Sequence, residues 1–71
     1  MTKTLTGTFN SSDAARNAHE DFIASGFPTD KVYHARGSAE LKVIASSDNE
    51  PEIREILGRH KPTEIEVHGA V

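Results

Sequence analysis

The chain lacks several kinds of residue on which small proteins commonly depend. It contains no cysteine and no tryptophan among its 71 residues, so disulfide bonds and thiolate metal ligands are both excluded. A chain of this length buries only about 60% of its unfolded surface when it folds. Small domains without such cross-links often gain stability by associating. We therefore predict one domain spanning residues 1–71, with an expectation of homodimerisation.

Concentrated positive charge and long apolar runs are absent as well. The eight Lys and Arg residues are dispersed among eleven Asp and Glu residues, which gives a formal net charge of −3, whereas nucleic-acid binding needs a concentrated basic surface. No apolar stretch approaches the roughly 20 residues of a membrane span. The first residues show no apolar signal-peptide core. The sequence predicts a cytoplasmic protein that binds neither nucleic acid nor membrane.

What the chain does contain is an ordered succession of strand and helix patterns. Residues 14–25 and 51–57 carry apolar side chains at helical spacing, with charged residues between them. Strands are predicted where the pattern alternates or is rich in β-branched and aromatic residues, at 4–9, 31–35, 40–45 and 64–68. Gly7 weakens the first strand unless a helix packs closely over it.

Short polar clusters, glycines and prolines mark the ends of the helices. Ser11-Ser12-Asp13 and Ser46-Ser47-Asp48 are each predicted to cap the helix that follows. Gly26 and Gly58 are predicted to end the two helices, because glycine readily adopts the left-handed backbone found there. Phe27 is expected to tuck under the end of the first helix.

The order strand, helix, strand, strand, helix, strand predicts a ferredoxin-like α+β sandwich. Right-handed crossovers and a single buried sheet face then require an antiparallel sheet of order 4-1-3-2 with both helices on one face. The predicted core consists of apolar residues from all the long elements, namely Leu5, Phe9, Phe22, Ile23, Leu41, Val43, Ile53, Ile56, Leu57, Ile65 and Val67.

The opposite sheet face is left uncovered in this arrangement and is the predicted interaction surface. It is expected to carry Thr4, Thr6, Thr8, Tyr33, Lys42, Ile44, Glu66 and His68. RNA-recognition domains of similar topology stack bases on aromatic residues of the first and third strands. Because Thr, Lys and Ile occupy those positions here, a protein partner is favoured over nucleic acid.

No residue pattern in the sequence indicates catalysis, a metal or a cofactor. The two Ser-Ser-Asp clusters follow the first and third strands, which run antiparallel, so they are expected at opposite ends of the sheet. The loop Phe9-Asn10-Ser11-Ser12-Asp13 lacks the arginine of acylphosphatase-type sites, and Asp13 would repel an anion. None of the four histidines has a partner at the helical metal-site spacing; His34 and His68 are predicted on opposite sheet edges.

Three segments resemble a known family. Thr6-Gly7-Thr8-Phe9, Ser25-Gly26-Phe27-Pro28 and Ile56-Leu57-Gly58-Arg59-His60 are similar to segments in the small domain of bacterial general-stress-type proteins. The resemblance implies the same fold and a bacterial, stress-associated protein. These segments are turns, caps and core positions, and the family offers no agreed catalytic residues to carry over.

The sequence thus predicts a non-enzymatic protein that acts through protein contacts, either with a second copy of itself or with another protein. The alternative is a small-molecule-sensing domain with its ligand at a boundary between protomers.

Overall fold

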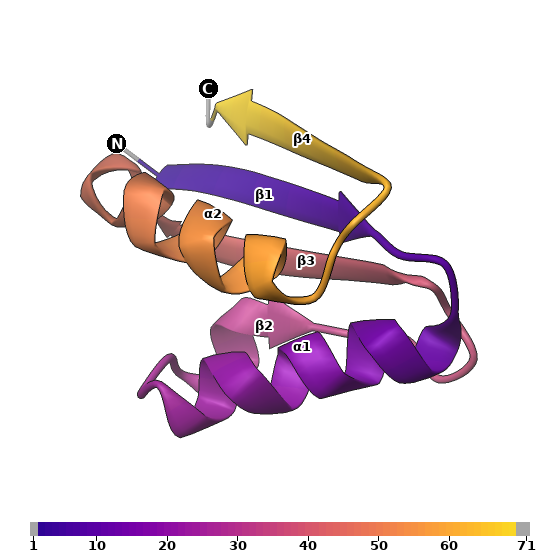
Figure 1. Cartoon of the computed structure of the whole chain (residues 1–71). Helices are drawn as coiled ribbons and strands as arrows, with labels where there is room; N and C mark the ends of the chain where they lie inside the picture. The colour runs from indigo at the N-terminus through magenta and orange to yellow at the C-terminus, as the bar shows by residue number, and fades with distance from the viewer. Residues whose placement is uncertain (1, 70–71) are drawn as a thin grey trace.

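The computed structural model describes residues 2–69 and contains four strands, two α-helices and two short 3-10 helices (Figure 1). In chain order they are β1 (Thr2–Thr8), α1 (Ser12–Ala24), η1 (Thr29–Lys31), β2 (Val32–Tyr33), β3 (Glu40–Ser46), η2 (Ser47–Asn49), α2 (Glu50–Arg59) and β4 (Glu64–Gly69).

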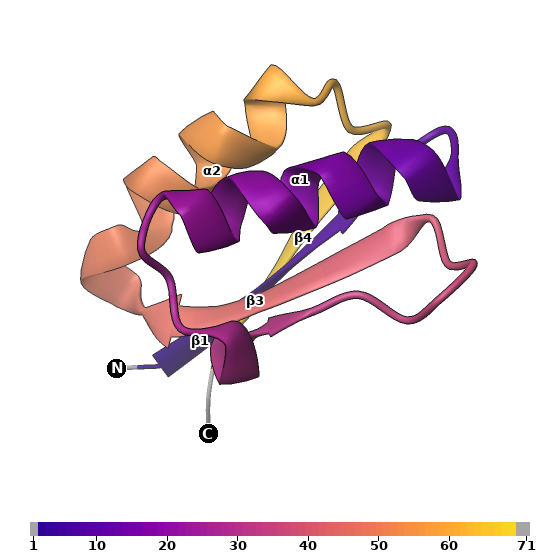
Figure 2. The same cartoon turned by 90° about the horizontal axis from the view of Figure 1, so that it is seen from below.

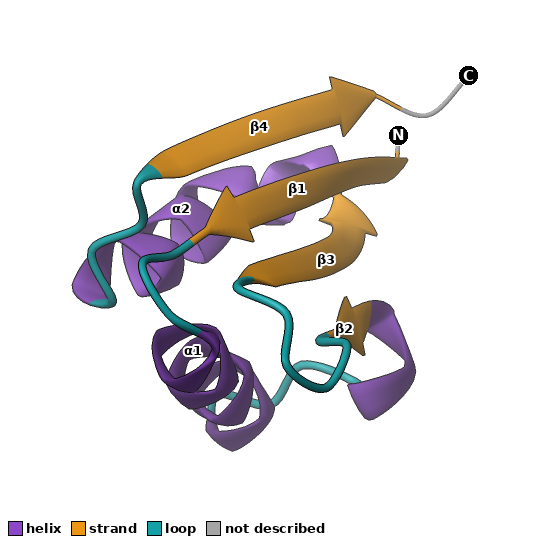
Figure 3. Ribbon diagram, turned by 90° about the vertical axis from the view of Figure 1, so that its right-hand side faces the viewer, coloured by secondary structure: helices purple, strands orange, loops and turns teal. Residues whose placement is uncertain are grey.

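The strands form one antiparallel sheet whose order is β2-β3-β1-β4. This is the predicted order 4-1-3-2 counted from the other edge, so the predicted ferredoxin-like α+β fold is confirmed. Both helices lie on one face of the sheet (Figures 2 and 3). Helix α1 packs over β3 and β2, and α2 packs over β1 and β3.

The core lies between the helices and the sheet. Each helix contributes three fully buried apolar residues, Ala15, Ala18 and Phe22 from α1 and Ile53, Ile56 and Leu57 from α2. The other buried apolar residues are Leu5, Phe9, Val32, Leu41 and Val43. Three predicted core residues, Ile23, Ile65 and Val67, are only half-buried. The last two are on β4, an edge strand that the helices cover less completely.

Gly7 is buried under α2. This is the close helix packing that the sequence analysis required for a strand to contain a glycine here. A Cβ placed on Gly7 would lie 2.9 Å from Leu57 Cδ2 and 3.3 Å from the Phe9 ring. A side chain at this position would therefore require the buried Leu57 and Phe9 side chains to shift, so a larger residue here should destabilise the packing of α2 on the sheet.

Both ends of α1 follow the predicted chemistry. Ser11 precedes the helix, and its Oγ accepts a hydrogen bond from the Ala14 amide at 3.2 Å. At the other end Gly26 has a φ of +99°. The Gly26 amide donates to the Ile23 carbonyl, and the Phe27 amide donates to the Phe22 carbonyl. These two bonds define a Schellman motif. The Phe27 ring packs edge-on against Phe22 with centroids 5.2 Å apart.

The ends of α2 differ from the prediction. Residues Ser47–Asn49 form η2 instead of a cap, and Asn49 at the start of α2 makes no side-chain capping bond. Pro51 in the first turn helps to start the helix instead, since its fixed φ suits that position. The helix runs through Gly58 to Arg59, so Gly58 does not end it. The residue with left-handed backbone is Lys61, with a φ of +54°.

The second strand is shorter than its sequence pattern indicated. Residues 31–35 were expected to be extended, but only Val32 and Tyr33 pair with β3. Residues Thr29–Lys31 form η1, and the chain leaves the sheet at His34. At the opposite edge, the Thr63 amide donates to the Thr8 carbonyl at 2.7 Å, which guides the chain into β4.

Candidate functional site

The uncovered sheet face carries all eight residues of the predicted surface. Residues paired across neighbouring strands point to the same side, and so do alternate residues along one strand. The strand register therefore makes four rows on this face: Tyr33–Lys42–Thr6–Glu66, Ile44–Thr4–His68, Glu40–Thr8–Glu64 and Ser46–Thr2. The register adds Thr2, Glu40, Ser46 and Glu64 to the predicted set.

The face is shallow and mostly polar. One depression of about 370 Å³ is lined by Thr4, Thr6, Glu40, Lys42, Glu66 and His68. A second, of about 380 Å³, lies beside it toward the β2 edge and is lined by Tyr33, Ala35, Ser38, Glu40 and Lys42. Tyr33 is 51% exposed and is the exposed large hydrophobic residue of the described chain. Glu40 and Lys42 belong to both depressions and separate them.

Carboxylates dominate the charge of this face. The interaction with the neighbouring Glu66 carboxylate raises the pKa of Glu64 above its ordinary value, and the negative charge of Glu40 raises it further. His68 Nε2 lies 3.2 Å from Glu66 Oε2. Three carboxylates thus share the face with one lysine, so it is acidic at neutral pH.

The two Ser-Ser-Asp clusters are far apart, as predicted. In the β1–β3 register Thr2 pairs with Ser46 and Thr8 pairs with Glu40. The cluster after β1 therefore lies at one end of the sheet, and the cluster after β3 lies at the other. They cannot act together in one protomer.

The histidines contact different parts of the molecule. His60 Nε2 lies 2.9 Å from Asp21 Oδ2 and thereby links the end of α2 to α1. His34 Nε2 donates to the Ser38 carbonyl at 2.8 Å, and its ring centroid lies 6.3 Å from that of His19. His34 directly follows the edge strand β2 and His68 lies on the opposite edge strand β4, so the two are on opposite sides of the sheet, as predicted. Within residues 2–69, no three His, Asp or Glu side chains are grouped closely enough to hold a metal.

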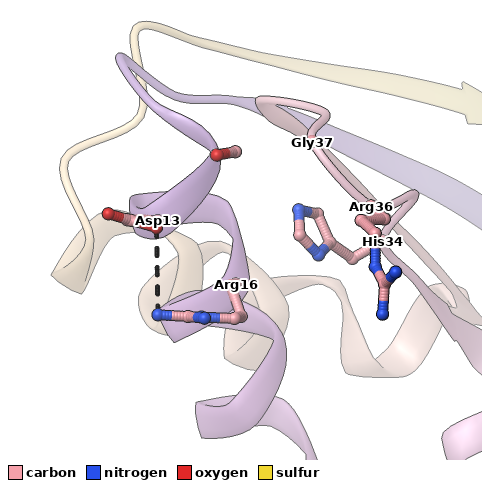
Figure 4. Close-up of a pocket in the computed structure, with 6 residues that line it drawn as sticks. Asp13, Arg16, His34, Arg36 and Gly37 are labelled. Atoms are coloured by element: carbon pink, nitrogen blue, oxygen red, sulfur yellow. Dashed lines mark ion pairs between the residues drawn. The ribbon is translucent and has the colours of Figure 1, made fainter.

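One cavity was not foreseen from the sequence. It measures about 410 Å³, lies between the first turns of α1 and the loop after β2, and is lined by Ser12, Asp13, Arg16, His34, Arg36 and Gly37 (Figure 4). The sequence signal was the i, i+4 spacing of Ser12 and Arg16, which places both on one side of a helix. Which segment would face that side depends on the tertiary fold.

Comparison with known proteins adds no relative, since no family model, curated protein or solved structure matches this chain. Among the described residues, no helix has both the length and the apolar character needed to cross a membrane.

Proposed function

We propose that this protein is a non-enzymatic interaction module that binds a partner protein through its uncovered sheet face. The observation that supports this most directly is the row Tyr33–Lys42–Thr6–Glu66, which runs across all four strands with no helix over it. An aromatic residue at one end of such a row supplies contact area, and charged residues along it supply orientation.

The charge of the face favours a basic partner. Glu40, Glu64 and Glu66 outnumber Lys42, and the raised pKa of Glu64 reflects repulsion already present in the protein alone. A basic surface would relieve that repulsion. A second copy of the same face would add three more carboxylates, so homodimerisation through this face is disfavoured at neutral pH.

The partner must cover most of the face. A stable protein interface takes roughly 800 Å² from each partner, which is nearly a fifth of the 4369 Å² surface of this protein. Neither depression alone offers that area. The proposed partner therefore presents a broad basic surface with an apolar group opposite Tyr33.

This proposal is tested with a lysine-rich peptide that contains one tryptophan, monitored by amide NMR signals. We expect signals of the face, such as those of Thr6 and Lys42, to shift saturably. A Glu64→Gln/Glu66→Gln double variant should bind more weakly, by about tenfold if each carboxylate contributes as an exposed ion pair. The matched control is Glu52→Gln/Glu55→Gln on the exposed side of α2, which should bind normally.

The Tyr33→Glu variant and a sedimentation experiment distinguish a basic partner protein from a second copy of this chain. Tyr33→Glu should also weaken peptide binding, because it replaces the aromatic contact. The proposal is wrong if the peptide shifts only signals outside the face. It is also wrong if the Glu52→Gln/Glu55→Gln variant weakens peptide binding as much as the Glu64→Gln/Glu66→Gln variant does. A stable dimer at micromolar concentration that Tyr33→Glu disrupts would identify a second copy as the occupant instead.

Small-molecule sensing is the second candidate, because one depression combines opposite charges. Lys42 and Glu66 both line the 370 Å³ depression, which suits a ligand with one positive and one negative group. A thermal-shift screen against amino acids tests this, since a ligand at 100 times its Kd stabilises the folded state by about 2.7 kcal/mol.

The cellular setting is proposed from the family resemblance. The resemblance to bacterial general-stress-type proteins supports a stress-associated role in a bacterial cytoplasm. Induction of the protein when cells are stressed, and its recovery in the cytoplasmic fraction, are the measurements that test it.

A further inference from the structure

Strand β4 leaves one of its two edges unpaired. The sheet order β2-β3-β1-β4 makes β4 an outer strand, and no strand within residues 2–69 pairs with its far side (Figure 3). β4 spans Glu64–Gly69 and so offers a long edge, whereas β2 on the opposite side contains only Val32 and Tyr33. A long unpaired edge is a template for pairing with another chain.

The backbone groups at this free edge can be identified from the bonds of β1. Along a strand, consecutive residues direct their N–H and C=O groups to opposite edges. The Phe9 amide donates to the Ala39 carbonyl, beside β3. The preceding carbonyl, that of Thr8, accepts from the Thr63 amide, beside β4. Thr8 pairs with Glu64, so Glu64 and every second residue after it face β1. The other β4 residues direct their backbone groups to the free edge, namely Ile65, Val67 and Gly69.

The side chains of β4 present different chemistry on the two sides of the sheet. Ile65 and Val67 point to the helix side and are only half-buried there. Glu66 and His68 point to the uncovered face and are 54% and 65% exposed. Within one chain, His68 Nε2 lies 3.2 Å from Glu66 Oε2, so the imidazole and the carboxylate suit each other as partners.

Two requirements restrict how a second copy can pair with this edge. Directly opposite residues point to the same face of a sheet, and residues whose backbone groups point outward must face one another. An antiparallel pairing with Val67 opposite Val67 meets both requirements. It also places Ile65 opposite Gly69 and Glu66 opposite His68 of the second copy. A shift of the pairing that places Glu66 opposite itself brings two carboxylates together, so charge favours the register centred on Val67.

We propose that two copies of this chain pair through β4, around a two-fold axis at Val67, and form one continuous antiparallel sheet. Each outward-facing pair exchanges two main-chain hydrogen bonds. Glu66 and His68 form the pairs between them, in which the Cα atoms lie only about 4.5 Å apart. Carboxylates on an edge strand commonly discourage pairing, but Glu66 faces an imidazole in this register. The dimer leaves the uncovered face free and does not depend on the proposed basic partner.

The absence of cysteine from the chain allows a direct test by cross-linking. Val67→Cys places one thiol at the axis, where the Cα atoms of a hydrogen-bonded pair lie about 5.5 Å apart, a separation suited to a disulfide. Mild oxidation should therefore produce a covalent dimer on a non-reducing gel. Ile65→Cys is the matched control, because Ile65 is a half-buried residue on the same face of the same strand. It faces Gly69 of the second copy, so it should remain monomeric.

Sedimentation measures the association without a new thiol. The unaltered chain should form a dimer at micromolar concentration. His68→Glu places carboxylates opposite one another and should weaken the dimer about tenfold, the loss expected for two exposed ion pairs. The double exchange Glu66→His/His68→Glu restores unlike partners and should restore the dimer. Tyr33→Glu lies at the other edge of the sheet and should leave it unchanged.

Several results would overturn this dimer. A monomer throughout the micromolar range would do so, as would equal cross-linking of Val67→Cys and Ile65→Cys, which indicates random collision. Cross-linking of Ile65→Cys alone would show a different register. A dimer that Tyr33→Glu disrupts and His68→Glu does not would place the contact on the uncovered face. Binding of the lysine-rich peptide is measured separately, so failure of the β4 dimer leaves the proposed function standing.

Discussion

The backbone of Lys61 is the clearest departure from local preference at the scale of single residues. A φ of +54° places a lysine where helices commonly end with glycine. The Lys61 amide donates to the Gly58 carbonyl at 3.2 Å. The following residue, Pro62, has no amide proton, so the second bond of the Schellman motif that α1 makes cannot form here. The end of α2 is therefore the weaker of the two.

Replacing Lys61 by glycine should stabilise the protein. The left-handed backbone costs a residue with a Cβ about 1–2 kcal/mol, and the extra freedom of glycine in the unfolded chain costs about 0.5–1 kcal/mol. Lys61→Gly should then gain about 0.5–1 kcal/mol in urea unfolding at neutral pH. Lys61→Ala keeps the Cβ and should gain nothing, so an equal gain in both variants would show that the lysine side chain, not the backbone, is responsible.

At the scale of elements, Glu50 joins the first strand to the second helix. Its carboxylate lies 2.8 Å from Lys3 Nζ on β1 and 2.9 Å from Arg54 Nε one turn further along α2. Hydrogen bonds from Lys3 and then Arg54 lower the pKa of Glu50 below its ordinary value of 4.5. Because α2 lacks a side-chain cap, this bridge holds its first turn against the sheet.

The Glu50 bridge predicts a loss of stability in acid. The folded protein binds a proton at Glu50 less readily than the unfolded chain does, so the stabilisation is present above pH 4.5 and disappears as the pH falls through the lowered pKa. Glu50→Gln should therefore be less stable than the parent protein at neutral pH, with the difference shrinking in acid. Urea unfolding over that pH range measures it. Glu52→Gln, an exposed change on the same turn, should follow the parent curve; if Glu50→Gln does so too, the bridge does not contribute.

Features that depend on residues close together in the sequence could be predicted from it. Contacts between segments far apart in the sequence could not. Ser11, Gly26 and Phe27 carry their local signals in the sequence, and the structure of α1 follows them. Gly58 carries a similar signal, but α2 continues past it to Arg59, and Lys61 adopts the left-handed backbone after the helix. The residues that lie together on the uncovered sheet face could be predicted from the period-two alternation of each strand, once the strand order was known.

The cavity lay outside what such patterns can give. Ser12 and His34 have unremarkable neighbours in the sequence, and they line the same cavity only because the first turns of α1 lie beside the loop after β2. The pairing of Lys3 with Glu50 has the same origin. Likewise Glu40 and Glu64 join the uncovered face through strand register, which fixes where each strand begins relative to the next.

At the scale of the whole molecule, the uncovered face holds most of the net negative charge. Glu40, Glu64 and Glu66 share it with Lys42, so this face contributes −2 to the formal net charge of −3. A surface that gathers like charges destabilises the folded protein, and such a surface is expected where binding, rather than stability, determines the residues.

Glu64 allows this idea to be tested, because stability and binding should respond to it in opposite directions. The neighbouring Glu66 carboxylate and the charge of Glu40 raise the pKa of Glu64, so the folded protein holds this proton more readily than the unfolded chain does. The favourable contribution is present below the ordinary value of 4.5 and is lost as the pH rises through the raised pKa. At neutral pH the charge is therefore unfavourable to folding.

Glu64→Gln should accordingly raise the Tm at neutral pH, with no gain in acid, while it weakens binding of the lysine-rich peptide. Glu20→Gln, an exposed change on α1, removes one negative charge far from the face and should alter neither quantity. A lower Tm for Glu64→Gln would contradict the repulsion, and unchanged peptide binding would separate these carboxylates from the proposed interface. Opposite changes in the two measurements are expected only if the carboxylates are retained for a basic partner at the expense of stability.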